Sequence, residues 1–233
     1  MVQVLQKLGQ LNKSTTTSTS KRNAHSSSVA ILDAAEHLMS LRGYNSVSMR
    51  EIAKQAKVSL SSVTHFYGTK ENLLAAIYER HTKPMNARRV ELLNEAARIS
   101  NPDEQLSAIV RAYIIPAFSS QTDSGGGAQF TRLRGIMSME GHDVAKRIIA
   151  GSFDEISNIF IDAIHHAVPN SDRVSIIWRA HFLLGSLYYT LVTPERIDRL
   201  TGEDGAGSDH TRAVDELVSA TVASFKDLAG SAA

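Results

Sequence analysis

The stretch Ser48–Lys70, SMREIAKQAKVSLSSVTHFYGTK, decides how the chain folds. Ser48 can cap a helix, because Glu51 follows three residues later and can bond back to the Ser48 amide. Beyond the cap, apolar residues recur at three- and four-residue spacing and predict one buried helix face. These residues are Met49, Ile52, Ala53 and Ala56. The stretch therefore predicts a short amphipathic helix that begins at Ser48.

A second short helix is expected after a tight turn at Lys57 and Val58. Ser59 can cap this helix, and Val63 and Phe66 fall on its apolar side. The other side carries the polar residues Ser61, Ser62, Thr64 and His65. Small hydroxyl groups and an imidazole can enter a DNA major groove and bond to base edges or phosphates. The pair of helices predicts a helix-turn-helix, although such pairs also occur in helical proteins that never bind DNA.

The longer stretch Gly43–Leu73 resembles the DNA-binding signature of TetR-family transcriptional regulators, in order and in spacing. The matching residues are Gly43, Tyr44, Ser48, Ile52, Ala53, Ala56, Val58, Ser59, Val63, His65, Gly68, Thr69, Lys70, Glu71 and Leu73. The sequence departs from the family pattern at four positions. Lys57 stands at the usual turn glycine, Ser61 at a glycine or alanine, Thr64 at a tyrosine and Tyr67 at a phenylalanine. A glycine replaced by lysine carries a cost if the turn needs a positive φ.

The resemblance implies a role in DNA binding for individual residues of this stretch. We expect Ser61, Ser62, Thr64 and His65 to face bases, with Ser59 at the start of their helix. We expect Ser48, Tyr67, Thr69 and Lys70 to hold phosphates. The helix N-terminus beside Lys70 is a suitable phosphate site, because its amides and its dipole favour anions.

The charge of the chain is unevenly distributed, although the net charge of the 233 residues is only +1. Residues 1–83 carry eleven basic and five acidic side chains, whereas residues 84–233 carry 14 basic and 19 acidic ones. This distribution suggests that the N-terminal part meets a polyanion, or else that it carries a basic tail.

The absence of cysteine excludes disulfides, thiolate metal sites and thiol nucleophiles. The longest uncharged apolar segment, Phe182–Val192, is too short to span a bilayer, and no secretory signal is evident at the N-terminus. A cytoplasmic location is expected.

The remaining chain shows helical spacing and no strand pattern, so an all-α fold is expected. We expect a Ser/Thr-rich disordered tail at 1–26, a three-helix DNA-binding domain at 27–77, and a larger helical effector-binding and dimerisation domain at 78–233. Helices are expected from Ser27 or Ser28 to Leu41 and from Thr69 until Pro84 bends or interrupts the helix, with helical spacing resuming at 88–99. Further helices are expected at 103–118, 130–137, 142–168, 171–191 and 211–228. Residues 119–128 and 193–210 are expected to be loops, the latter a mobile connection.

An effector pocket is expected inside the second domain, with apolar walls and a few polar groups. Its candidate residues are Tyr113, Phe118, Phe130, Met137, Phe153, Trp178, His181 and Phe182. Taken singly, each of these residues is more typical of core than of ligand contact, and His181 would need a hydrogen-bond partner if it were buried. The last two long helices are the candidates for a homodimer interface, through Leu184, Gly185, Leu187, Tyr188, Val218, Thr221 and Val222.

Neither a metal site nor a cofactor is expected. The candidate imidazoles are His142, His165, His166 and His181, but adjacent histidines point to different helix faces and no carboxylate stands at a convincing ligand spacing from them. An enzymatic function is not expected, since the glycine run 125–127 lacks the Lys-Ser/Thr of a phosphate-binding loop.

The sequence thus predicts a ligand-responsive DNA-binding transcriptional regulator. The resemblance implies a repressor that binds a palindromic double-stranded operator as a homodimer and is released by a small, largely apolar effector. The alternative is a helical ligand-binding or protein-interaction module whose helix-turn-helix no longer binds DNA.

Overall fold

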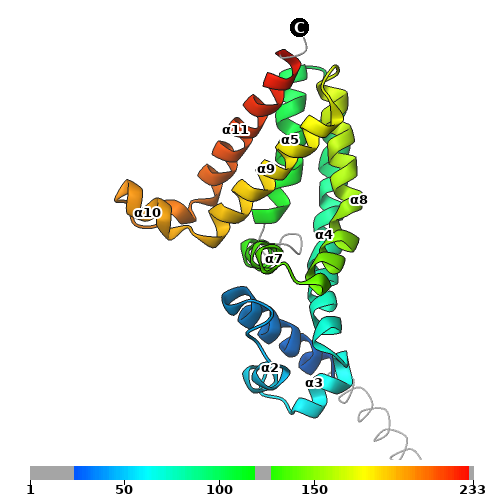
Figure 1. Cartoon of the computed structure of the whole chain (residues 1–233), viewed down its shortest axis with the longest axis vertical. Coiled ribbons are helices and arrows are strands. Elements are labelled where there is room, and N and C mark those ends of the chain that lie inside the picture. The colour runs from blue at the N-terminus through cyan, green and yellow to red at the C-terminus, as the bar shows by residue number, and fades with distance from the viewer. Residues whose placement is uncertain (1–23, 119–126, 231–233) are drawn as a thin grey trace, which may run out of the picture. The chain divides into compact units, whose positions relative to one another are not determined.

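The computed structural model describes residues 24–118 and 127–230, and every regular element in these ranges is a helix (Figure 1). After a first helical stretch at 24–42 come α2 (Met49–Gln55), α3 (Leu60–Tyr67), α4 (Lys70–Ala96), α5 (Pro102–Phe118), α7 (Ala128–Glu140), α8 (Asp143–Ala167), α9 (Arg173–Val192), α10 (Glu195–Thr201), the 3-10 turn η1 (Ala206–Ser208) and α11 (His210–Gly230). The expected all-α fold is confirmed.

The chain divides into two compact units, Met1–Ala76 and Ile77–Ala233. The boundary falls inside α4, so this helix begins in the first unit and ends in the second.

The first unit is built on a small core to which each of its helices contributes. Its fully buried apolar side chains are Ile31, Ala35 and Met39 of the first helix, Ile52 of α2, Val63 of α3, and Leu73 and Leu74 of α4. The first helix is already formed at Ala24, three residues before the expected start. It ends at Gly43, where a positive φ of 79° and a bond from its amide to the Met39 carbonyl close the last turn.

The second unit is a bundle in which α11 packs on α5 and α9, α7 packs on α9, and α8 packs on α5 and α9. Aromatic rings fill its core, and the Tyr113 and Phe160 rings stack with centroids 4.3 Å apart. The helix α4 runs through Pro84 without a break, so the expected interruption there is wrong. A proline removes one helical hydrogen bond, and the next residue, Met85, is buried.

The segment 193–210 is ordered, which corrects the expectation of a mobile connection. It forms α10 and η1, and α10 (orange) extends away from α5 and α8 in Figure 1. The Gly207 amide donates to the Asp198 carboxylate at 2.7 Å and fastens η1 to α10. A Cβ at Gly207 would lie only 2.0 Å from the Pro194 carbonyl oxygen. Amino-acid composition does not reveal such a close backbone approach. The glycines of this segment therefore predict a loop, and not the packing of η1 against Pro194.

Two expected features fall largely outside the described residues. These are the N-terminal tail, of which 1–23 are outside, and the loop at 119–128, of which 119–126 are outside.

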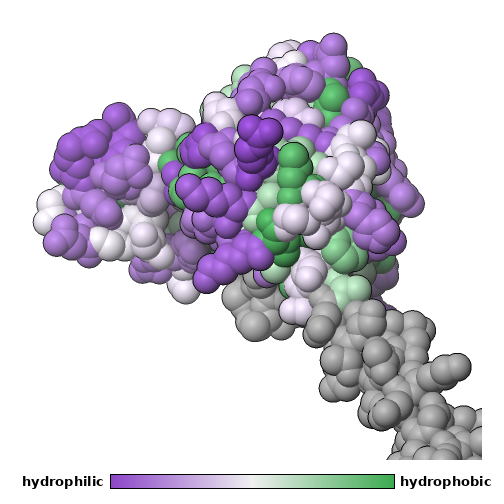
Figure 2. Space-filling view, turned by 90° about the horizontal axis from the view of Figure 1, so that it is seen from below, coloured by the Kyte–Doolittle hydropathy of each residue, from purple (hydrophilic) through white to green (hydrophobic). Residues whose placement is uncertain are grey.

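Hydrophilic residues predominate on the face shown in Figure 2, and hydrophobic ones form small patches between them. Within 24–118 and 127–230, no helix combines the length and the apolar character needed to cross a bilayer.

Candidate nucleic-acid interface

The helix α2 begins with the predicted capping box. The Glu51 amide donates to the Ser48 hydroxyl at 3.2 Å, while the Ser48 amide and hydroxyl donate to the Glu51 carboxylate at 2.8 and 2.7 Å. Arg42 also donates to this carboxylate at 2.8 Å. Hydrogen bonds from Ser48, and then from Arg42, lower the pKa of Glu51 to about 2. The carboxylate therefore stays ionised and holds the start of α2 in place.

The turn between α2 and α3 places Lys57 in the left-handed region, with a φ of 56°. The Val58 amide donates to the Ala53 carbonyl at 3.0 Å, and the Lys57 amide donates to the Lys54 carbonyl at 3.2 Å. These two bonds make a Schellman motif, whose left-handed position is usually occupied by glycine. The strain expected from Lys57 is therefore present.

The helix α3 is held by its cap and by one buried side chain. The Ser62 amide donates to the Ser59 hydroxyl at 3.0 Å, as predicted. Val63 is the one buried residue of α3, and Phe66 is half-buried. The opposite side of α3 must therefore face away from the core of the first unit.

On this outward side Ser61, Thr64 and His65 are exposed and Ser62 is half-buried. The expected base-facing residues thus lie together on one surface. The Ser59 hydroxyl lies 2.8 Å from the hydroxyls of both Ser61 and Ser62, so the three form one polar group at the start of α3.

Leu60, at the start of α3, is 40% exposed, although it is absent from the set expected from the sequence. It precedes Val63 by three residues and Thr64 by four, so it lies at the border between the buried side and the outward side. Its place one turn before Thr64 is the signal that could have found it. An exposed leucine beside hydroxyl groups can contact a thymine methyl group.

Two expected phosphate contacts have internal roles instead. The Tyr67 hydroxyl donates to the Ser28 carbonyl at 3.0 Å and lies 2.7 Å from the Ser28 hydroxyl, so it fastens α3 to the first helix. Both donors of Ser48 are bonded to Glu51. A phosphate contact needs a hydrogen-bond donor that is not already used within the chain, so Ser48 and Tyr67 are not among the proposed phosphate contacts.

The N-terminus of α4 keeps its expected features. The Thr69 hydroxyl accepts from the Asn72 amide at 3.1 Å and caps the helix. The Lys70 ammonium lies 4.2 Å from the centroid of the Tyr44 ring, which positions it beside the first turn. Burial, and then the charge of Glu71, raise the pKa of Tyr44, so the ring stays neutral. A fixed cation beside helix amides suits a phosphate.

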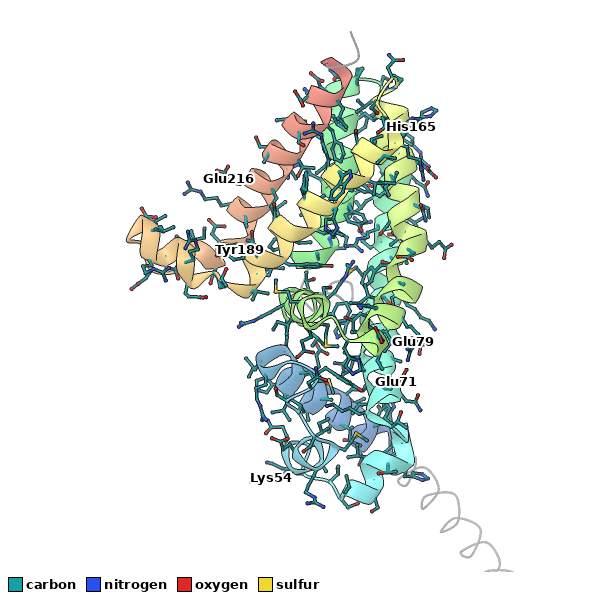
Figure 3. All side chains as sticks on the ribbon, in the orientation of Figure 1. Lys54, Glu71, Glu79, His165, Tyr189 and Glu216 are labelled. Atoms are coloured by element: carbon teal, nitrogen blue, oxygen red, sulfur yellow. The ribbon has the colours of Figure 1, made fainter. Side chains whose placement is uncertain are left out.

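Further cations, to which the sequence alone gave no role in DNA binding, lie on α2 and its turn. Arg50, Lys54 and Lys57 are exposed, and none of them forms an ion pair with any described residue. Figure 3 shows Lys54 projecting outward from α2. Their place in the sequence could have indicated this role. Arg50 and Lys54 lie on the side of α2 opposite Ile52, and Lys57 lies in the turn that follows. These side chains add positive charge beside α3.

The expected effector residues of the second unit do not form one site. Tyr113, Phe130, Met137 and Phe153 are buried in the bundle, and Phe118 is half-buried with its ring 5.3 Å from that of His210. In contrast, Trp178 and Phe182 are 57% and 59% exposed, and His181 is exposed as well. Their rings contact one another on the outside of α9. An interior pocket lined by all eight residues is therefore wrong, since α9 turns these three outward.

No group of three or more histidines and carboxylates within the described ranges could hold a metal ion. His142 instead caps α8, where its Nδ1 accepts from the Val144 amide at 3.2 Å.

Two family models match the chain. The model for bacterial regulatory proteins of the tetR family matches residues 31–77, and the model for the tetracyclin repressor-like C-terminal domain matches residues 111–224. None of the curated proteins compared with the chain matches it.

Solved structures of TetR-family regulators share the fold. A regulator from Bordetella parapertussis 12822 is 19% identical with a TM-score of 0.59, over 85% of this chain and 93% of that one. PfmR from Thermus thermophilus is 15% identical with a TM-score of 0.55, over 84% and 97% of the chains. A TetR-like regulator from Rhodococcus sp. RHA1 is 22% identical with a TM-score of 0.53, over 84% and 93%. The chain has a capped helix-turn-helix and a second unit whose described elements are helices, and both parts match the family models. This chain therefore belongs to the TetR family of transcriptional regulators.

Proposed function

We propose that the protein represses transcription by binding a palindromic operator as a homodimer, and that a small molecule releases it. Residues 27–77 would bind DNA, and residues 78–233 would bind the effector and form the dimer. The observation that carries this proposal is the outward polar surface of α3, which is anchored from behind by Val63. The protein would act in the cytoplasm as a regulator rather than an enzyme.

The proposed contacts with DNA divide into two groups. Ser61, Ser62, Thr64 and His65 would face base edges in the major groove, with Leu60 able to contact a thymine methyl group. Thr69 and Lys70 would hold phosphates, supported by Arg50, Lys54 and Lys57. The first group would supply specificity, and the second group affinity that depends on salt.

The homodimer is supported by an exposed apolar row along α9. Five large side chains are exposed along one side of α9: Val174, Ile177, Trp178, Phe182 and Tyr189. Figure 3 labels Tyr189 on this helix. Gly185 lies in the same row, and nothing lies within 4 Å of its Cβ direction, so a partner helix could approach closely there. A second copy of the chain, paired by two-fold symmetry, is the occupant we propose.

This row replaces most of the dimer contacts expected from the sequence. Leu187, Tyr188, Val218 and Thr221 are buried within the chain, so they pack in its own bundle. Only Gly185 of the expected set is exposed on α9.

Release by an effector would be a population shift. The effector must bind the DNA-incompetent conformation better than the DNA-bound one, by the coupling free energy between the two sites. Equal affinity for free and operator-bound protein would contradict this mechanism.

The decisive experiment is selection of random duplex DNA by the purified protein, followed by sequencing. We expect enrichment of a palindrome whose half-sites lie about 34–36 Å apart, or a multiple of this distance. Binding to the selected fragment should weaken steeply with salt, because phosphate contacts release counterions. Absence of both enrichment and salt dependence would favour the alternative, a helical module with an inactive helix-turn-helix.

A further inference from the structure

Two arginine side chains lie inside the second unit. Arg89 of α4 is fully buried, and Arg134 of α7 is only 4% exposed. Neither forms an ion pair with a carboxylate in the part of the chain that the structure describes. Both guanidinium groups are therefore buried without a negative partner from these residues.

The hydrogen bonds of the two guanidinium groups are incomplete. Arg89 donates from Nε to the Tyr113 carbonyl at 3.0 Å and from Nη1 to the Asn86 side-chain oxygen at 3.3 Å. Its Nη2 and the Nε of Arg134 are buried without an acceptor among the described residues. Donors that are buried and unused in this way cost free energy unless an acceptor from outside the chain bonds to them.

Aromatic rings surround both groups and bring them close together. The Cζ of Arg134 lies 3.4 Å from the centroid of the Phe153 ring, and the Cζ of Arg89 lies 5.8 Å from the same centroid. Arg89 also lies 4.4 Å from the Tyr113 ring centroid, and Arg134 lies 5.4 Å from that of Tyr188. Since both cations gather around Phe153, each raises the electrostatic cost of the other.

The Arg89 guanidinium remains charged near neutral pH. Burial, with a further contribution from the charge of Arg134, lowers the pKa of Arg89 to about 10, which is still well above 7. Contacts with aromatic rings offset only part of the cost of burying a cation. The penalty for a buried ion without a counterion is larger, so the rings alone do not balance it.

A phenol hydroxyl adds an unused donor at the same place. Tyr78 is buried, its ring centroid lies 6.5 Å from that of Phe153, and its hydroxyl has no hydrogen-bond partner among the described residues. The electrostatic influence of Arg134 reaches the hydroxyls of both Tyr78 and Tyr188. Unused donors from α4 and α7 therefore lie close together. Tyr188 of α9, whose hydroxyl has a hydrogen bond with Ser138, lies at the same place, and none of these side chains brings a negative charge.

We propose that this arginine cluster, formed by Arg89, Arg134, Tyr78, Tyr188 and Phe153, binds the acidic head group of an organic anion. A carboxylate or a phosphate monoester would accept from the guanidinium and phenol donors. The apolar part of the ligand would lie against the aromatic rings of the same bundle. The inference rests on the proposed function, because it makes this anion the effector, and it revises the expected largely apolar effector to an amphiphilic acid.

The first test needs the full-length protein without DNA. Thermal unfolding is measured with straight-chain monocarboxylates from acetate to dodecanoate, each paired with the neutral amide of the same length, and with octyl phosphate paired with octanol. At saturation we expect at least one acid to raise Tm by about 5 °C or more over its neutral partner at equal ionic strength. The head group that gives the larger rise identifies the source as carboxylate or phosphate. Equal shifts for acids and neutral partners, or no shift, would overturn the site.

A variant assigns the effect to the arginine cluster. Arg134→Met keeps a long apolar side chain and removes the charge, so the acid-specific rise should disappear. Tm without ligand should stay unchanged or rise, because an uncompensated buried charge is removed. Arg196→Met, on the exposed side of α10, should keep the full rise. Retention of the rise in Arg134→Met would contradict the proposal. If that variant does not fold, Arg89→Gln, which also removes one charge from the cluster, takes its place, with binding of the acid measured by titration calorimetry. Acid binding equal to that of the wild type would then contradict the proposal.

Operator binding is measured separately, so that the two proposals can fail independently. An acid that binds the cluster and releases the operator supports both. An acid that binds without affecting the operator supports the site and overturns its role as effector. Loss of all DNA binding, with the acid-specific rise retained, overturns the proposed function and leaves the site.

Discussion

At the scale of single residues, Lys57 is the position where the local conformation and the residue type disagree. Its φ of 56° suits glycine, and a lysine there costs roughly 1 kcal/mol. We expect Lys57→Gly to raise the free energy of unfolding by roughly 0.5–1 kcal/mol, measured by urea denaturation. Lys54→Gly removes the same charge from the helical part of α2 and should lower it by about 1 kcal/mol. Loss of stability in both variants would show that the strain at Lys57 is not significant.

The division between base and phosphate contacts also belongs to single residues. His65→Ala should change the relative affinities for operators that differ at particular base pairs, because the imidazole is exposed on α3. Lys70→Met keeps the stem on the Tyr44 ring and should weaken binding to all sequences equally, reducing the salt slope by about 1. Fluorescence anisotropy at several salt concentrations measures both. A uniform loss from both changes would refute the division.

At the scale of elements, the cap of α2 gives a pH dependence of stability. The folded pKa of Glu51 lies near 2, below its ordinary value of 4.5, so the ionised form stabilises the fold. This stabilisation is complete above the ordinary value and is lost as the pH falls toward the folded one. Glu51→Gln retains a side chain that can complete the capping box and removes the charge. The difference in unfolding free energy between wild type and variant should shrink from about pH 5 to about pH 2. A constant difference would contradict the assignment.

The segment formed by α10 and η1 depends on one glycine. A Cβ on Gly207 would meet the Pro194 carbonyl oxygen at 2.0 Å, and a backbone atom cannot move aside easily. Gly207→Ala should destabilise the segment by roughly 1–3 kcal/mol, seen as faster amide exchange at 194–209. Gly151→Ala, where nothing lies within 4 Å of the new atom, should instead stabilise α8 by roughly 0.5–1 kcal/mol. Unchanged exchange at 194–209 would mean that the segment tolerates the added atom.

At the scale of the whole molecule, the apolar row on α9 is the feature that a single chain leaves uncovered. Trp178→Glu with Phe182→Glu should convert the dimer to a monomer in sedimentation experiments, because two charges would be buried at the interface. Operator affinity should then fall by a factor of about 100 or more, because the second half-site is no longer bound by the same particle. Met139→Glu changes an equally exposed apolar residue of α7 and should leave the dimer intact. A double variant that remains dimeric would place the interface elsewhere.

The sequence by itself determined the all-α fold and the helix-turn-helix, down to the caps at Ser48 and Ser59 and the strained turn at Lys57. These features depend on residues within about five positions of one another, so spacing and hydrogen-bonding capacity predict them directly. Only the tertiary structure decided which side of α9 faces the bundle, that Tyr67 bonds to Ser28, and that Arg89 and Arg134 meet around Phe153. Helix α9 carries apolar residues on several sides, and the other contacts join distant parts of the chain, so only packing could select among them.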